Sequence, residues 1–282
     1  MNRVAVVSAG PLTTLQDAGR AGLAHLGVPP SGAFDRNAFA LGNHLVGNAP
    51  HAAALEATLV APTLRFAEAA VVAVTGARTA LAHGEPIEVT AGATLELGPC
   101  RDGVRAYIAV YGGFDAEPVL GSRSHDLLTG LGPPPLRDGD ELVVGDAAGE
   151  PTPPPPVRMS DVLRIAPGPR DDWFEPEALD ILTGTTWRVA NASNRVGLRL
   201  EGPPLPRLER GELLSEGVVT GALQVPPSGR PILLGPDHPT TGGYPILAVV
   251  LHDDVPLAAQ LGPGAPVRFA LGRGQHSSLG ES

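Results

Sequence analysis

The chain of 282 residues contains no lysine, since all 20 of its basic side chains are arginines. Covalently attached biotin, a lysine Schiff base and a P-loop lysine are therefore excluded, because each needs a lysine amine. We interpret the bias first as the coding preference of a GC-rich genome. Its chemical consequence is that anions must be bound by arginine forks, backbone amides and hydroxyls, because arginine is not a tunable amine base.

Cysteine is almost as rare, with Cys100 the single example. One cysteine cannot form an intrachain disulfide or a cysteine-based zinc site. The eight histidines never recur at i, i+2 or i, i+4. No HExxH, GxSxG, Walker A or CxxC motif is present, so we predict no metal site in this chain.

A basic surface is also missing, because the formal net charge is −10. Phosphate neutralisation needs a basic face, so we expect no nucleic-acid partner and no attraction to an anionic membrane. The longest apolar run, at 246–251, is the length of a strand and too short to cross a bilayer. The first residues lack the apolar core of a secretory signal, and we expect a cytoplasmic protein.

What the sequence has in abundance is glycine and proline, 36 and 31 residues, placed between short apolar runs. This pattern is typical of many short strands and predicts a mainly β fold, a barrel or a sandwich. We expect a turn-rich stretch over 12–30, and helices over 36–46, with Asp35 as N-cap, and 176–183. Strands are predicted at 4–7, 64–66, 71–76, 87–89, 94–97, 104–113, 141–145, 162–166, 186–190, 198–202, 218–225, 231–235, 245–251 and 267–271.

A proline-rich segment, GEPTPPPPV at 149–157, divides the chain. Four consecutive prolines cannot join a sheet ladder and favour an extended linker. We therefore predict two β-rich subdomains, residues 1–150 and residues 158–282.

Three polar segments are candidates for chemistry. The first is the turn at 30–35, which contains Ser31, together with Glu56, a lone acid among small apolar residues that needs a partner if it is buried. A turn with a helix cap is the alternative for 30–35, and a structural role for Glu56 is as well supported as a functional one.

The second segment, 190–202, carries Asn194, Arg195 and Arg199. Amide groups and planar guanidinium forks suit a carboxylate or phosphate ligand, and a polar hairpin with an Arg–Glu pair is the alternative. The third segment runs from Asp237 to Tyr244 between two apolar strands, with Gln224 upstream. Its two hydroxyls and two glycines are typical of sites for small, oxygen-rich ligands, although a glycine-rich turn has the same composition.

Long ordered motifs at 10–48, 55–59, 193–202, 215–234 and 237–250 carry a resemblance to a known family. They include SNRVGLRLEG and DHPTTGGYPILAVV, and the resemblance extends from about residue 4 to about residue 270. The chain resembles the carboxyltransferase-like KipA family. That family contains the KipA-type subunit of bacterial 5-oxoprolinase and the matching part of the urea carboxylase carboxyltransferase domain, and it is also labelled allophanate hydrolase subunit 2.

The resemblance implies a cyclophilin-like β-barrel architecture and a KipI-like partner. For the 5-oxoprolinase members it implies a complex, with a LamB/YcsF-like third subunit, that hydrolyses 5-oxo-L-proline to L-glutamate with ATP and Mg²⁺, which one of the partners can bind. The urea carboxylase relatives imply a biotin-dependent carboxyltransferase instead, served by carboxybiotin from another chain. A third implication is a non-catalytic regulator of a KipI-like kinase inhibitor.

Under the 5-oxoprolinase implication, the candidate residues take the following roles. Arg195 or Arg199 binds the substrate carboxylate. Thr240, Thr241 and the amides of Gly242 and Gly243 face carbonyl or phosphate oxygens. Glu56 or Asp237 acts as a base or binds Mg²⁺. The remaining expected substrate-binding residues are Ser31, Asn194, Gln224 and Tyr244.

Overall fold

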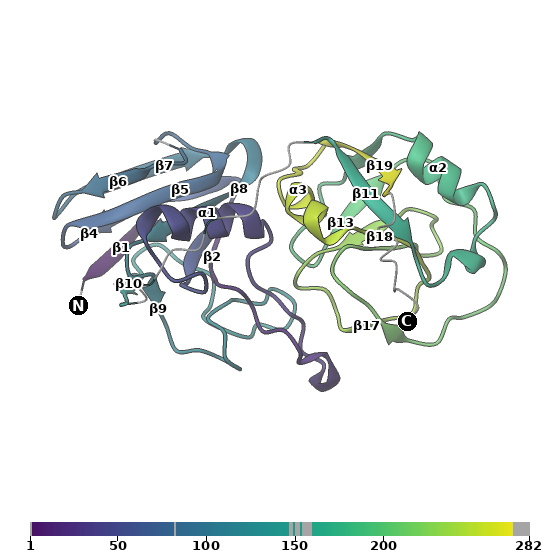
Figure 1. The fold of residues 1–282 in the computed structure, drawn as a ribbon, viewed down its shortest axis with the longest axis horizontal. Coiled ribbons are helices and arrows are strands. Elements are labelled where there is room, and N and C mark those ends of the chain that lie inside the picture. The colour runs from purple at the N-terminus through teal and green to yellow at the C-terminus, as the bar shows by residue number, and fades with distance from the viewer. Residues whose placement is uncertain (1, 82, 147–148, 150–152, 154–159, 273–282) are drawn as a thin grey trace, which may run out of the picture.

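A computed structural model describes residues 2–81, 83–146, 149, 153 and 160–272. It is a mainly β protein, as predicted, and its strands form two groups that lie side by side (Figure 1). The predicted linker at 149–157 lies outside the described residues except for Gly149 and Pro153. Within the described residues, no helix is both long and apolar enough to cross a membrane.

The amino-terminal group consists of two five-stranded antiparallel sheets. The first has the order β7-β4-β1-β10-β9, formed by β1 (Arg3–Ser8), β4 (Val60–Phe66), β7 (Thr94–Pro99), β9 (Phe114–Asp115) and β10 (Glu141–Val144). The second has the order β2-β3-β8-β5-β6, formed by β2 (Leu12–Gln16), β3 (Ala54–Thr58), β5 (Ala70–Arg78), β6 (Pro86–Val89) and β8 (Arg101–Val110). An apolar core contributed by both sheets holds them together.

Side-chain alternation gives the second sheet two different faces. In β3, Leu55 and Ala57 belong to the core between the sheets, whereas Ala54 belongs to a second cluster beneath α1 (Arg36–Val46). Because successive side chains of a strand point to opposite faces, Glu56 lies on the same face as Ala54. The strand therefore presents its one acid away from the core of the sheets, toward the rest of the molecule.

Helix α1 matches the predicted bounds and has the expected cap. The Asp35 side chain accepts a 3.0 Å hydrogen bond from the Ala38 amide, and Gly47 ends the helix with φ 77°. A Cβ on Gly42 would lie 3.2 Å from the Thr75 hydroxyl, so the small residue lets the helix approach β5 closely.

The carboxyl-terminal group is a closed barrel of seven strands in the order β11-β18-β15-β16-β13-β12-β19. Among the described strands, only β11 and β19 pair in parallel. The barrel strands are β11 (Val162–Pro167), β12 (Trp187–Val189), β13 (Gly197–Glu201), β15 (Ala222–Gln224), β16 (Ile232–Leu234), β18 (Ile246–Val250) and β19 (Pro266–Leu271). A two-stranded ribbon and two short helices accompany them: β14 (Glu216–Gly217), β17 (Thr241–Gly242), α2 (Ala178–Gly184) and α3 (Val255–Ala259).

Two local predictions were wrong. The stretch 12–30 was expected to be turn-rich with no strand assigned to it, but its first five residues form β2, which pairs with β3 along its whole length. The predicted strand 218–225 is reduced to β15, because residues 218–221 are not in a strand and Thr220 and Gly221 form a turn. Both differences follow from pairing partners that are distant in sequence, which local composition does not reveal.

Phe34 joins the two groups of strands. It precedes α1 in the amino-terminal group, but its side chain is 1% exposed and belongs to the apolar core of the barrel. The Arg105 guanidinium of β8 lies over its ring, 4.8 Å from the centroid. Burying an aromatic side chain of this size stabilises a fold by about 2–3 kcal/mol, so Phe34 acts as an apolar anchor between the halves.

Candidate functional site

A row of polar side chains crosses the face of the second sheet that looks toward the barrel. The antiparallel register places Glu56 directly opposite Tyr107, with Thr14 and Thr75 opposite these two on the outer sides. Side chains directly opposite in a sheet are close enough to interact. The Tyr107 hydroxyl accordingly donates a 2.7 Å hydrogen bond to Glu56, and the Phe34 amide donates a second one of 3.0 Å to the same carboxylate oxygen.

The barrel contributes Arg195, which lies between two carboxylates. Its Nη1 donates to Glu56 at 2.7 Å, while its Nε and Nη2 donate to the two oxygens of Asp237 at 2.8 and 2.9 Å. Nη2 also donates to the Gly32 carbonyl at 2.7 Å. All three charged side chains are at most 1% exposed, and all three nitrogens of the Arg195 guanidinium donate hydrogen bonds inside the protein.

The network keeps its charges at neutral pH. Burial alone would raise the pKa of Glu56, but the guanidiniums of Arg195 and Arg105 outweigh it and the pKa is lowered. Burial would likewise raise the pKa of Asp237, and Arg195 lowers it. Burial, followed by the Glu56 charge, raises the pKa of Tyr107 well above its usual value. Glu56 and Asp237 are therefore ionised, and Tyr107 is a protonated donor.

A second set of hydrogen bonds extends from this network to α1 and α3. The Tyr107 hydroxyl accepts a 2.7 Å hydrogen bond from the Asp35 amide, and Gln260 donates one of 2.7 Å to the Asp35 carboxylate. Gln260 also accepts from the Arg105 amide at 3.1 Å. Residues of both halves thus fix the start of α1, and with it the turn that precedes the helix.

That turn is held in a constrained conformation. Ser31 has φ 51° and Gly32 has φ 83°, both in the left-handed region. A Cβ on Gly32 would lie 2.9 Å from the Gly19 nitrogen, so the backbone needs glycine there. Non-glycine residues with positive φ are concentrated at functional sites, which draws attention to the space beside Ser31.

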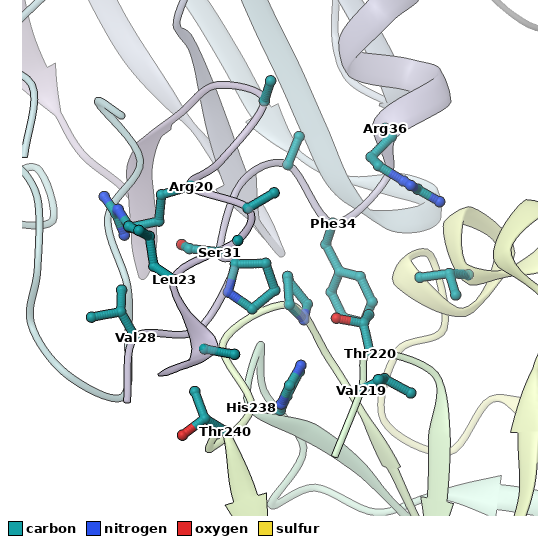
Figure 2. Close-up of a pocket in the computed structure, with 18 of the residues that line it drawn as sticks. Arg20, Leu23, Val28, Ser31, Phe34, Arg36, Val219, Thr220, His238 and Thr240 are labelled. Carbon is teal, nitrogen blue, oxygen red and sulfur yellow. The ribbon is translucent and has the colours of Figure 1, made fainter. Parts of the chain in front are cut away.

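A pocket of about 480 Å³ opens beside this turn, between the two halves (Figure 2). One wall comes from the segment 18–36 and the other from 218–220, 236–240, His252 and Val255. Ser31, Phe34, Arg36, His238 and Thr240 are among the side chains that face it. A pocket of this size between two units, mostly apolar with a few polar groups, is typical of small-molecule sites.

Arg36 and His252 close one side of the pocket across the two halves. Arg36 Nη2 donates a 2.9 Å hydrogen bond to the His252 carbonyl, and Nη1 contacts the His252 ring. Burial lowers the pKa of Arg36 even though Asp253 and Asp35 raise it. The nearby acids therefore compensate this cation incompletely, and an anionic ligand beside it would be stabilised.

Deeper in the wall, three buried polar atoms have no hydrogen-bond partner among the described residues: Arg20 Nη1, His125 Nδ1 and Asp126 Oδ2. Burial is the largest influence on Arg20 and lowers its pKa, although Asp17 and Asp126 raise it. Such atoms are costly to bury, so the region around Arg20 holds polar atoms that the described residues leave without a hydrogen bond.

The structure divides the predicted site residues into three sets. Ser31 and Thr240 line the pocket. Glu56, Arg195 and Asp237 lie behind the lining residues and are engaged with one another. The third set lies outside the lining and consists of Asn194, Arg199, Gln224, Thr241, Gly242, Gly243 and Tyr244. Thr241 and Tyr244 are exposed, because the segment leaves the pocket at Thr240 and enters the β14–β17 ribbon.

Sequence reasoning missed the pocket residues Arg20, Arg36, His238 and His252, as well as Tyr107 and Gln260 behind the pocket. His238 adjoins the predicted Asp237, so its signal was present. Arg36 follows the predicted N-cap, where a cation is unfavourable for the helix dipole, and that mismatch could have singled it out. Within the described residues, no group of three or more His, Cys, Asp or Glu side chains is arranged to hold a metal ion.

Comparison with known proteins supports the sequence resemblance. A profile described as the carboxyltransferase domain, subdomain A and B, matches residues 26–271. A 5-oxoprolinase subunit of Escherichia coli (strain K12) is 38% identical over 94% of this chain and 89% of its own length. The corresponding 5-oxoprolinase subunit of Haemophilus influenzae is 33% identical, over 91% of this chain and 87% of its own length.

The crystal structure of the K. lactis urea amidolyase superposes with a TM-score of 0.88 at 30% identity. The match covers 95% of this chain but only 18% of that much longer one. The fold and the nearly full-length sequence similarity agree, and the chain belongs to the family of carboxyltransferase domains, subdomain A and B.

Proposed function

We propose that this chain is the KipA-type subunit of a 5-oxoprolinase, a complex that hydrolyses 5-oxo-L-proline to L-glutamate together with ATP hydrolysis. The observation that carries the proposal is the 38% identity to the E. coli 5-oxoprolinase subunit over nearly the full length of both chains. In the proposed complex, the other subunits are a KipI-like and a LamB/YcsF-like protein. ATP and its Mg²⁺ are assigned to the complex, with a partner subunit as their binding site.

The lining of the pocket suits the proposed substrate in charge and polarity. The substrate is a small ring that carries a carboxylate, and the pocket offers apolar walls with Arg36 at one side. Because the charge of Arg36 is incompletely compensated within the chain, we assign the substrate carboxylate to this guanidinium. This assignment replaces Arg195, whose donors are already engaged with Glu56, Asp237 and Gly32.

The role of the chain in the reaction is positioning. A lactam carbonyl is a poor electrophile, and ATP hydrolysis supplies the driving force for water to add to it and for the ring C–N bond to break. Holding the lactam ring in one orientation lowers the entropic cost of bringing its carbonyl and the attacking water together. The ion network of Glu56, Arg195 and Asp237 keeps the two pocket walls in register without entering the pocket.

Reconstitution tests the proposal. The chain is mixed with its KipI-like and LamB/YcsF-like partners, 5-oxoproline and ATP-Mg are added, and glutamate is measured. We expect glutamate and ADP in equal amounts only when all three proteins are present. Equal glutamate formation without this chain would refute the proposal.

A second candidate function is the carboxyltransferase half-reaction of a biotin-dependent urea carboxylase. It is favoured by the TM-score of 0.88 to the K. lactis urea amidolyase. The chain has no lysine, so carboxybiotin would come from a separate carrier. Adding urea, bicarbonate, ATP, a biotin carboxylase and a biotinylated carrier to the same assembly, and measuring carboxylated urea by mass spectrometry, separates the two functions.

A further inference from the structure

His238 stands in the pocket wall with its ring directed into the space beside Phe34 and Ser31 (Figure 2). It follows Asp237 in the crossing between β16 and β17. Its side chain is held by burial, since the residue is only 4% exposed. The ion pair between Asp237 and Arg195 fixes the backbone immediately before it. The imidazole is thus a preorganised part of the wall.

The hydrogen bond made by one ring nitrogen determines the role of the other. Nδ1 lies 2.7 Å from the Pro239 carbonyl oxygen. A carbonyl oxygen can only accept, so Nδ1 carries the hydrogen. In the neutral imidazole, Nε2 then holds a lone pair, and within the described residues the ring makes no second hydrogen bond.

The surroundings of His238 favour its neutral form. Burial is the largest influence and lowers the pKa of the imidazole, whereas Asp237 and Asp126 raise it by smaller amounts. At neutral pH the ring is therefore uncharged. Nε2 is a hydrogen-bond acceptor in a wall whose other polar groups include the cation Arg36 and the hydroxyl of Thr240.

An acceptor fixed in a mostly apolar wall selects ligands that present a donor to it, because a buried polar atom without a partner is costly. We propose that His238 Nε2 accepts a hydrogen bond from the ring N–H of the bound lactam, which makes His238 a specificity-determining residue for small N–H amides. This inference rests on the proposed function, in which the substrate is a lactam.

The inference predicts which ring the pocket rejects. The lactone analogue of 5-oxoproline has a ring oxygen where the lactam has its N–H, so it brings an acceptor toward the Nε2 lone pair. A site that hydrogen-bonds a substrate N–H discriminates strongly against analogues that lack it. We expect the lactone to bind at least about tenfold more weakly than the lactam.

Two substitutions distinguish the roles of the two ring nitrogens of His238. His238→Asn keeps a donor near the position of Nδ1 and removes the acceptor at Nε2. His238→Gln extends an amide oxygen toward the position of Nε2 and restores an acceptor. Thermal unfolding of both variants, compared with the unaltered chain, checks that the fold is retained.

The test is equilibrium binding of 5-oxoproline and of its lactone analogue to the assembled complex without ATP, by calorimetry. We expect the preference for the lactam to disappear in H238N, with lactam affinity reduced about tenfold, and to return in H238Q. A purely structural role would weaken both ligands equally and leave the preference unchanged, which would overturn the inference. Absence of any lactam preference in the unaltered complex would overturn it as well.

Measuring glutamate formation by the same preparations distinguishes a failure of the specificity role of His238 from a failure of the proposed function. If glutamate formation needs the chain but H238N keeps the lactam preference, the specificity role fails and the proposed function stands. If the unaltered complex shows the lactam preference and H238N loses it, yet glutamate forms without this chain, the binding role is supported and the proposed function fails.

Discussion

Glu56 and Arg195 are separated by 139 residues, yet their side chains form a 2.7 Å ion pair in which each is 1% exposed. Glu56 comes from the sheet of the amino-terminal half and Arg195 from the loop before β13 of the barrel. Asp237 forms a second buried ion pair with the same guanidinium. The contact between the two halves, and the pocket beside it, therefore depends on a buried charge network.

Replacing Glu56 with Gln should destabilise the fold strongly. The change leaves the charges of Arg195 and Arg105 less compensated in a buried setting, and removing one partner of a buried ion pair costs about 3–5 kcal/mol. The measurement is urea unfolding followed by circular dichroism. Glu141→Gln is the matched control, because its ion pair with Arg3 is more than half exposed and should contribute little. Equal stability of the two variants would show that the network is not needed.

Phe34→Ala should loosen the connection between the halves. The ring belongs to the core of the barrel although its backbone belongs to the other half. Truncating a buried aromatic side chain costs about 3–5 kcal/mol. Limited proteolysis and calorimetry should show separate unfolding of the halves. Leu214→Ala, at a side chain that is 88% exposed, is the control. A single unfolding transition unchanged by Phe34→Ala would contradict the anchor role.

Stability should fall as the pH is lowered from about 7.5 to about 5.5. Burial lowers the pKa of His125 and of His238 below the usual value. In this window the unfolded chain binds protons at these residues and the folded chain does not, so the free energy of unfolding decreases toward acid pH. His125→Gln should reduce that slope, as measured by urea unfolding at several pH values. Burial raises the pKa of Asp35, which also contributes to the pH dependence of stability. Its contribution is the same in the unaltered chain and in the His125→Gln variant, so it cancels when their slopes are compared. An unchanged slope would mean that His125 has the same pKa in the folded and in the unfolded chain.

Arg36→Gln should weaken substrate binding in the reconstituted complex. Removing the cation that we assign to the substrate carboxylate should raise KM for 5-oxoproline about tenfold, with kcat little changed, because the contact is made equally in the ground and transition states. Arg230→Gln, an exposed arginine outside the pocket lining, is the control. If KM is unaffected by Arg36→Gln, the carboxylate is bound elsewhere.

The sequence by itself determined the β-rich class, the helix at 36–46 and the family, because these depend on local patterns: short apolar runs, an N-cap followed by helical spacing, and long ordered motifs. It also identified Glu56, Arg195 and Asp237 individually as candidate site residues. Because the chain has no lysine, the sequence further implied that anions are bound by arginines, backbone amides and hydroxyls.

Only the tertiary structure decided that these three residues bind one another. It also decided that His238 lines the pocket whereas Thr241 and Tyr244, from the same segment, lie outside the lining. Strand alternation places Glu56 on one face of its sheet, but the side chain that meets it comes from a barrel more than a hundred residues away. Pairing across that distance depends on how two cores pack together, and no local pattern encodes it. The same packing places Arg36 and His238 in one pocket.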